Sequence, residues 1–183
     1  MTVRKKIILS VVGGSLFLIK SAMAVEYNIK IAGEIYIPPC KINNDADIQI
    51  SFGKISLREV DGYKNVVTKT VSITCEYYQG VPYIRVDGSV LSGAGDNVLE
   101  TTGINASSLG IALYQGNDVN ISYPLRIGTG KQGKYGYKIT RGLTEQNTTS
   151  GQFTFSAVPY KYGSMELLAG NFNATATMSI SYV

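Results

Sequence analysis

The chain has 183 residues, with 17 Lys and Arg against 13 Asp and Glu, two cysteines and no histidine. The lack of histidine removes the usual general base of enzymes and the commonest metal ligand. Four basic residues lie in the first 24, so the rest of the chain is balanced at 13 against 13. The formal charge of +4 therefore gives no reason to expect a nucleic-acid partner.

The first 24 residues have the pattern of a secretory signal peptide. A basic start at residues 4–6 is followed by the apolar stretch 7–19, which is too short to span a bilayer. Ala22-Met23-Ala24 then places small residues on both sides of the expected cut, before Val25. A short membrane anchor is the alternative, and Lys20 argues against it because it interrupts the apolar run.

Residues 25–37, VEYNIKIAGEIYI, alternate between apolar and polar side chains without a fault. A period of two predicts a strand, and this one is longer than the usual five or six residues, so a long surface must lie opposite it. The next two residues, Pro38 and Pro39, lack backbone donors and cannot continue a ladder. The opening strand is therefore expected to be separate from the domain that follows.

The two cysteines, Cys40 and Cys75, are expected to form a disulfide, because an even count in an exported protein favours pairing. The bond would close a loop of about 35 residues, worth roughly 3 to 4 kcal/mol in the chain-entropy model. Two free buried thiols are the alternative. Cys75 shares the apolar face of its expected strand with Val71 and Ile73, so it should face the core.

Almost every later segment has the alternation and composition of a strand. The expected strands are residues 47–53, 66–77, 82–90, 108–116, 121–128, 135–140, 151–158 and 171–183. They are separated by clusters of Gly, Asn, Asp, Ser and Pro, and only residues 97–104 leave room for a helical turn. This pattern predicts an all-β fold, an antiparallel sandwich of two sheets.

The last strand is long and amphipathic, like the first. Its apolar face holds Phe172, Ala174, Ala176, Met178, Ile180 and Tyr182. The two alanines would leave depressions in this row, and the isoleucines of residues 29–37, interrupted only by Gly33, have shapes that could fill them.

Two kinds of sequence motif suggest other functions, phosphate binding and glycosylation, but neither is supported by its sequence context. GTGKQGK at residues 128–134 matches much of a phosphate-binding loop, but Tyr135 stands where Ser or Thr is needed and a strand follows where a helix is needed. Four N-x-S/T triplets are explained by chance and turn chemistry in a chain rich in Asn, Ser and Thr. No carboxylate pair stands out for catalysis, and no metal or cofactor is expected.

Taken together, several of these segments resemble the subunits of chaperone-usher fimbriae. The likeness covers the whole chain after the signal peptide and rests on the strand around Gly33, IPPC at residues 37–40, TKTVSITC at 68–75, LGIALYQG at 109–116, FTFSAVPY at 153–160, and the C-terminal run with Gly170 and penultimate Tyr182. Within the family it resembles the minor tip pilins, in particular the adaptor between the adhesin and the tip fibrillum. A repeating tip subunit and a terminator remain alternatives for its position in the fibre.

The resemblance implies an incomplete immunoglobulin-like sandwich that lacks its final strand. The expected parts are a signal peptide at 1–24, an N-terminal donor-strand extension at 25–38 and a pilin domain at 39–183. The donor face would be Ile29, Ile31, Gly33, Ile35 and Ile37. The acceptor groove, which also binds the chaperone, would be lined by Phe172, Ala174, Ala176, Met178, Ile180 and Tyr182, with the carboxylate of Val183 held by the chaperone.

The expected partners are a periplasmic chaperone, an outer-membrane usher, neighbouring pilins and the tip adhesin, with export through the periplasm to the cell surface. The expected function is non-enzymatic: a structural subunit that polymerises by donor-strand exchange and supports adhesion. Two other classes stay open on the residues alone. One is a complete secreted binding domain whose opening strand pairs within the chain, and the other is a secreted carbohydrate-active enzyme built on two carboxylates.

Overall fold

The computed structural model describes residues 26–131 and 133–183. Contacts divide the chain into two units, residues 1–34 and 35–183, and each is described by itself. In the first unit, residues 26–34 belong to no strand or helix and are exposed to solvent. The signal peptide expected at 1–24 lies outside the described residues. Within the described ranges, no helix has the length and apolar character needed to cross a membrane.

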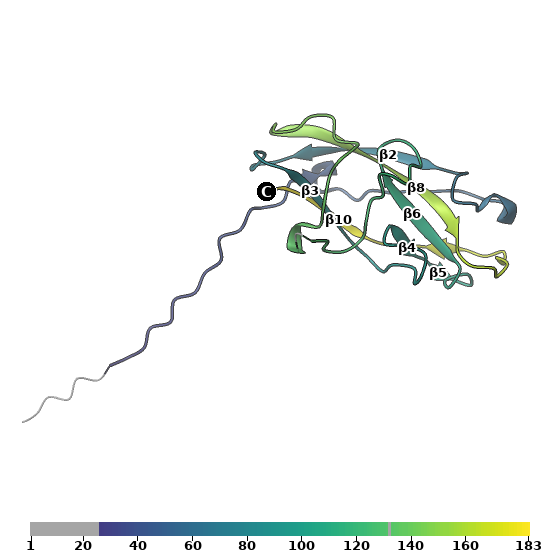
Figure 1. The fold of residues 1–183 in the computed structure, drawn as a ribbon, viewed down its shortest axis with the longest axis horizontal. Coiled ribbons are helices and arrows are strands. Elements are labelled where there is room, and N and C mark those ends of the chain that lie inside the picture. The colour runs from purple at the N-terminus through teal and green to yellow at the C-terminus, as the bar shows by residue number, and fades with distance from the viewer. Residues whose placement is uncertain (1–25, 132) are drawn as a thin grey trace, which may run out of the picture. The chain divides into compact units, whose positions relative to one another are not determined.

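The second unit is an antiparallel β-sandwich, as predicted (Figure 1). One sheet has the strand order β1-β2-β8-β6-β4, another the order β10-β3-β7, and β5 pairs with β9. The strands are β1 (Lys41–Ile42), β2 (Val67–Thr74), β3 (Pro82–Asp87), β4 (Val98–Glu100), β5 (Thr102–Gly103), β6 (Leu109–Gln115), β7 (Tyr137–Lys138), β8 (Ser150–Lys161), β9 (Phe172–Asn173) and β10 (Thr177–Tyr182). Short 3-10 turns occupy Asn43–Asp45, Leu57–Glu59 and Gly133–Tyr135.

The main core fills the space between the two larger sheets. Phe153 on β8 and Ile84 and Ile180 on the opposite sheet are completely buried. On β2 the alternation places Val71 and Ile73 in the core and threonines outside. Cys75 also faces inward, and its disulfide with Cys40 is present, as predicted.

A second, smaller core explains why every residue of β6 is buried. Ile111 and Leu113 face the main core, while Ala112 and Tyr114 face the other side of the sheet. There residues 89–91 bond alongside β4 and contribute Leu91 to a separate apolar cluster. β6 therefore lies between two apolar layers instead of showing the in-and-out alternation of a half-exposed strand.

The sequence predictions for residues 121–128 and 97–104 were wrong. Residues 121–128 form no regular strand, because Pro124 lacks a donor and the segment bonds first to Leu113 of β6 and then to Val86 of β3. Residues 97–104, where a helical turn was considered, hold β4 and β5. In both cases tertiary pairing overrides the local pattern.

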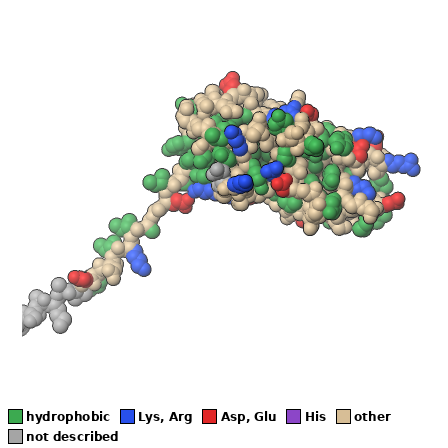
Figure 2. All heavy atoms as spheres, viewed as in Figure 1, with side chains coloured by type: hydrophobic (Ala, Val, Ile, Leu, Met, Phe, Trp, Pro, Cys, Tyr) green, Lys and Arg blue, Asp and Glu red, His purple; other side chains and the backbone are tan. Residues whose placement is uncertain are grey.

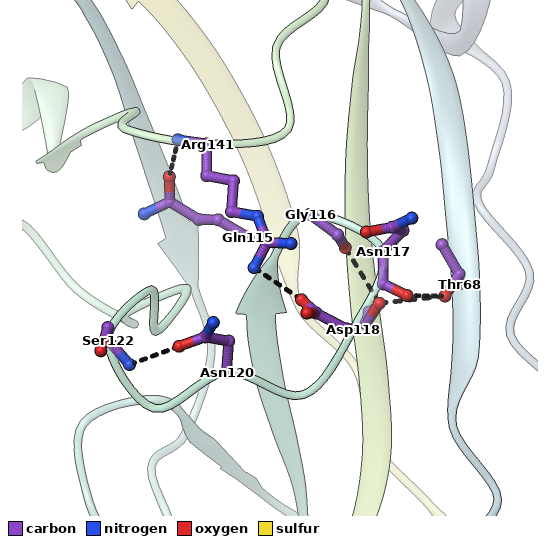
Figure 3. Close-up of polar contacts among 9 residues, drawn as sticks. Thr68, Gln115, Gly116, Asn117, Asp118, Asn120, Ser122 and Arg141 are labelled. Atoms are coloured by element: carbon purple, nitrogen blue, oxygen red, sulfur yellow. Dashed lines mark hydrogen bonds and ion pairs between the residues drawn. The ribbon is translucent and has the colours of Figure 1, made fainter.

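A buried amide holds the corner where β6 ends (Figure 3). The carboxamide oxygen of Gln115 accepts the backbone N–H groups of Thr140 and Arg141 at 2.9 and 3.2 Å, and its NH₂ group donates to the Pro124 carbonyl at 3.2 Å. The Arg141 guanidinium pairs with Asp118 at 2.6 Å. One side chain therefore satisfies three backbone groups that no strand ladder reaches.

We predict that Gln115→Met destabilises the chain by about 2 to 3 kcal/mol, because methionine keeps the volume but leaves two N–H groups and one carbonyl without partners. Urea denaturation of residues 25–183 measures the loss. The matched control is Gln152→Met, an exposed glutamine on β8, for which we expect a change below about 0.5 kcal/mol. Equal effects of the two substitutions would contradict the role given to Gln115.

Candidate functional site: an unpaired strand edge above the core

One edge of β10 has no partner strand over most of its length. On the other edge, Val183 and Val81 exchange both of their backbone hydrogen bonds, at 2.9 and 3.0 Å. In an antiparallel pair every second residue makes such bonds, so Thr177, Ser179 and Ser181 point their backbone groups at β3. Met178, Ile180 and Tyr182 must then point theirs away from β3. These are the residues whose side chains were predicted to form the inner row.

The junction of the opening segment with the sandwich closes this edge at one point. The Cys40 N–H donates to the Ile180 carbonyl at 2.7 Å, in an isolated antiparallel bridge. Directly afterwards, β1 pairs with β2 in the other sheet. Because Cys40 is held by the disulfide to Cys75, the edge is occupied at Ile180. From Met178 back to Ala174 the structure assigns it no partner among the described residues, and before that Phe172 and Asn173 pair with β5.

Residues 47–53 form the other side of this gap. They alternate strictly, with Ile48, Ile50 and Phe52 partly buried against the main core and the residues between them exposed. They were predicted to be a strand, yet no strand is assigned there and no strand pairing is found within the described ranges. The segment has the side-chain order of a strand without a neighbour to pair with.

Apolar side chains from residues 47–53 and from residues 172–178 pack against the same core. Phe172, Ala174 and Met178 pack against the same core cluster as Ile48, Ile50 and Phe52. The rings of Phe52 and Phe172 lie 6.2 Å apart, centroid to centroid. At the other end Cys40 bridges Ile180 of β10, so the segment from Cys40 to Phe52 contacts β10 at Ile180 and β9 at Phe172. Between these two contacts, the two partly buried apolar rows and the backbone without a strand partner define the candidate acceptor groove.

The predicted acceptor residues differ in burial along the chain. Ile180 and Tyr182 are fully buried, Phe172, Ala174 and Met178 are partly buried, and Ala176 is exposed. The predicted strand 171–183 is split into β9 and β10, with residues 174–176 unassigned. Hollows of about 450 and 310 Å³ adjoin this stretch on the side of residues 87–89 and 100–103, the first lined in part by Ala174 and the second by Ala176. Neither hollow is lined by Ile48, Ile50 or Phe52.

The C-terminal end of the row is fixed by the loop around Asn147. Its side-chain oxygen accepts the Gly80 N–H at 3.1 Å, and its backbone bonds to the hydroxyl of Tyr182. Burial raises the pKa of the Tyr182 hydroxyl above its ordinary value, and the bond to Asn147 opposes the rise. The phenol stays neutral at physiological pH, so the penultimate residue is a packed anchor. Val183, which follows it, is 43% exposed.

The predicted donor residues lie uncovered in the chain. Ile29, Ile31 and Ile35 are 83%, 92% and 101% exposed, and Ile37 is half-buried. Figure 2 shows this segment with hydrophobic side chains open to solvent. A Cβ added at Gly33 would meet no atom within 4 Å. Such a row of large apolar side chains on a soluble surface indicates an interaction site.

Sequence reasoning missed one wall of the groove. Ile48, Ile50 and Phe52 were assigned to an ordinary strand. The structure packs all three against the main core and places the Phe52 ring beside that of Phe172. Their alternation was visible in the sequence, but it does not distinguish a paired strand from an unpaired one.

Comparison with known proteins agrees with this geometry. The family model for fimbrial proteins matches residues 29–183. The chain is 43% identical over 92% of its length to the fimbrial adapter PapF of Escherichia coli, of which it covers 95%, and 42% identical with the same coverage to the minor fimbrial protein PrsF of Escherichia coli. The solved structure of the P pilus adaptor subunit PapF superposes with a TM-score of 0.55 at 38% identity, covering 81% of this chain and 98% of that one.

The fold and the groove thus define a pilin-like sandwich with an open strand edge. The chain belongs to the fimbrial protein family.

The open edge predicts a pattern of amide hydrogen exchange. In the isolated chain the amide of Met178 should exchange at least about 100-fold faster than those of Ser179 and Ser181, because only the latter two bond to β3. The Cys40 amide should be protected by Ile180. Exchange read residue by residue by NMR measures this. Protection of Met178 equal to that of Ser181 would show that the chain covers its own edge.

Proposed function

We propose that this chain is a structural minor subunit of a chaperone-usher fimbria and joins its neighbours by donor-strand exchange. The observation that carries the proposal is the unpaired edge of β10 above an apolar floor, in a chain that also has an uncovered row of isoleucines. In β-strand addition, backbone bonds supply affinity and alternate side chains in pockets supply specificity. The same chain has the acceptor of such a joint at one end of its sequence and the donor at the other.

The proposed division follows the sequence prediction: a signal peptide at 1–24, a donor extension at 25–38 and an incomplete pilin domain at 39–183. The proposed donor face is Ile29, Ile31, Gly33, Ile35 and Ile37. The proposed acceptor face is Phe172, Ala174, Ala176, Met178, Ile180 and Tyr182, and the Val183 carboxylate is proposed as the end that a chaperone holds. We add Ile48, Ile50 and Phe52 as the second wall of the proposed acceptor, because they pack against the same core cluster as Phe172 and Met178.

The energetics fit a joint that seldom opens. Burying four isoleucines contributes roughly 6 to 12 kcal/mol before ordering costs, which is comparable to the whole stability of a small domain. Conversely, an unfilled groove leaves an apolar edge open to aggregation. A chaperone that covers the groove before assembly and an usher that exchanges it for the next subunit would resolve this problem.

Within the fibre we propose the adaptor position, next to the tip adhesin, on the strength of the 43% identity to the adapter PapF. The protein would be exported through the periplasm and displayed at the cell surface. We propose that the chain is not an enzyme, since the relatives in the comparison are named as a fimbrial adapter and a minor fimbrial protein. The rival function is a complete secreted domain that pairs its own opening strand.

The test is to delete residues 25–37 and supply them as a peptide of residues 26–37. We expect the peptide to bind and to raise the thermal midpoint by more than 10 °C, because it completes the sheet and covers the groove. Differential scanning calorimetry measures the midpoint, and titration gives the affinity. A complete domain would be crippled by the deletion or indifferent to the peptide.

The matched control separates the two faces of the peptide. Replacing Ile31 by Asn should weaken binding at least about 30-fold, since roughly 2 kcal/mol of apolar burial is lost. Replacing Lys30 by Asn, on the opposite face, should change it less than threefold. Equal losses would mean that the isoleucine row does not enter the groove.

A further inference from the structure

The end of the groove at β9 carries an exposed apolar patch that the proposed joint does not use. The patch consists of Ile104, Met165 and Leu168, which are 63%, 64% and 56% exposed. Ile104 follows β5, which pairs with β9, and the other two lie on the loop that leads from β8 to β9. Single exposed apolar residues are ordinary on a protein surface, but three in adjoining loops beside an open groove call for a partner.

The patch is held in place by a pair of hydrogen bonds. The side chain of Asn105, itself buried, donates to the Leu168 carbonyl and accepts the Leu168 N–H, both at 2.8 Å. Ile104 lies close to Gly170, where an added Cβ would meet its side chain at 2.9 Å. The two loops are therefore fixed to each other while their apolar side chains face outward, as a preformed surface requires.

The direction of the incoming strand decides what lies against this patch. A strand that completes the antiparallel sheet runs opposite to β10, so its C-terminal end lies beside Phe172, at the patch end of the groove. In this chain only Pro38 and Pro39 separate Ile37, the last donor residue, from Cys40, which is already bonded into the sandwich. Three residue steps span at most about 10 Å. The folded body of the donating subunit must therefore lie directly beside β9 of the accepting subunit.

The surface that a donor of this kind would bring there is also apolar. In this chain the junction at Cys40 lies beside Ile180, near the C-terminus. Figure 1 shows the C-terminus and β5 at opposite ends of the sandwich. Near this junction Tyr77, which follows the disulfide-bonded Cys75 by two residues, is 57% exposed. Val81 and Val183, which bond directly to each other, are 36% and 43% exposed.

We propose that Ile104, Met165 and Leu168 form the docking surface for the body of the fimbrial subunit whose extension fills the groove. The partner that binds this patch is another subunit of the same fibre. It contacts the patch with the surface around the point where its own N-terminal extension joins its sandwich, the position of Cys40 in this chain. The contact is head to tail, between unlike surfaces, so it propagates along a fibre instead of closing a ring. This inference rests on the proposed function, and it adds a second contact to the joint beyond the exchanged strand.

The experiment compares two donors on the same acceptor, the chain of residues 25–183. One donor is the free peptide 26–37. The other is a second copy of the chain whose own groove is filled by a copy of residues 26–37 linked after Val183, and whose N-terminal extension is free. The acceptor is tested unchanged, as Ile104→Ser/Leu168→Ser, and as the control Ile121→Ser, an isoleucine that is 79% exposed on the loop after β6.

We expect the double variant to release the second copy about tenfold faster than the unchanged acceptor, and to bind the peptide with the same affinity within twofold. Ile121→Ser should alter neither. Hydrogen exchange gives a second measure: residues 162–171 should gain protection with the second copy and not with the peptide. Equal release rates together with no added protection would overturn the docking surface. If the peptide itself fails to bind any acceptor, the proposed function fails first.

A further variant checks that the short junction is what brings the bodies together. Inserting six Gly and Ser residues between Ile37 and Pro38 of the donating copy leaves its donor strand intact and joins the strand to the folded body through a flexible linker. We expect this donor to leave the unchanged acceptor about tenfold faster, and to be insensitive to the double variant. A lengthened donor that still distinguishes the two acceptors would contradict the part assigned to the junction.

Discussion

The structure depends on one missing set of hydrogen bonds, those that the backbone of β10 would make on the side away from β3. Every buried backbone group in a folded protein needs a partner, and an apolar strand edge left open invites another chain. Among residues 26–131 and 133–183, this edge has a partner only at Ile180, whose carbonyl accepts the N–H of Cys40. Beyond that point, in the described part of the chain, no strand pairs with this edge of β10 or covers the partly buried side chains of Phe172 and Met178.

The disulfide has a local role beyond restricting the unfolded chain. It joins Cys40 to Cys75, immediately after β2, and so fixes the junction between the two sheets. Cys40 bonds to Ile180 on one sheet, and the next residues pair with β2 on the other. The position at which the groove ends is thus set by a covalent bond. An incoming strand cannot slide beyond it, which limits the registers open to a row whose side chains repeat every second residue.

Much of this was predictable from residue patterns, and the misses have physical causes. The alternation in β2, the inward cysteine and the two amphipathic terminal strands follow from local periodicity, which the pleat dictates. Residues 121–128 had an acceptable strand pattern, but Pro124 and contacts to two different sheets prevented a ladder. Residues 47–53 had a perfect alternation and formed no strand, because a strand requires a paired neighbour and none is assigned to them in the described part of the chain. No single sequence can show that a pairing is absent.

The register at Cys40 also bears on why the missing strand should come from outside. Cys40 meets Ile180 in an antiparallel bridge, so the residues before Cys40 are directed toward Tyr182 and beyond the end of β10, away from the groove. To fill its own groove in the antiparallel sense, the extension would have to enter beside Phe172, at the far end. Its own junction with the sandwich is fixed at the near end, only two prolines after Ile37. Reversal within those prolines would yield a parallel strand at best, so the geometry that opens the groove also favours a donor from another chain.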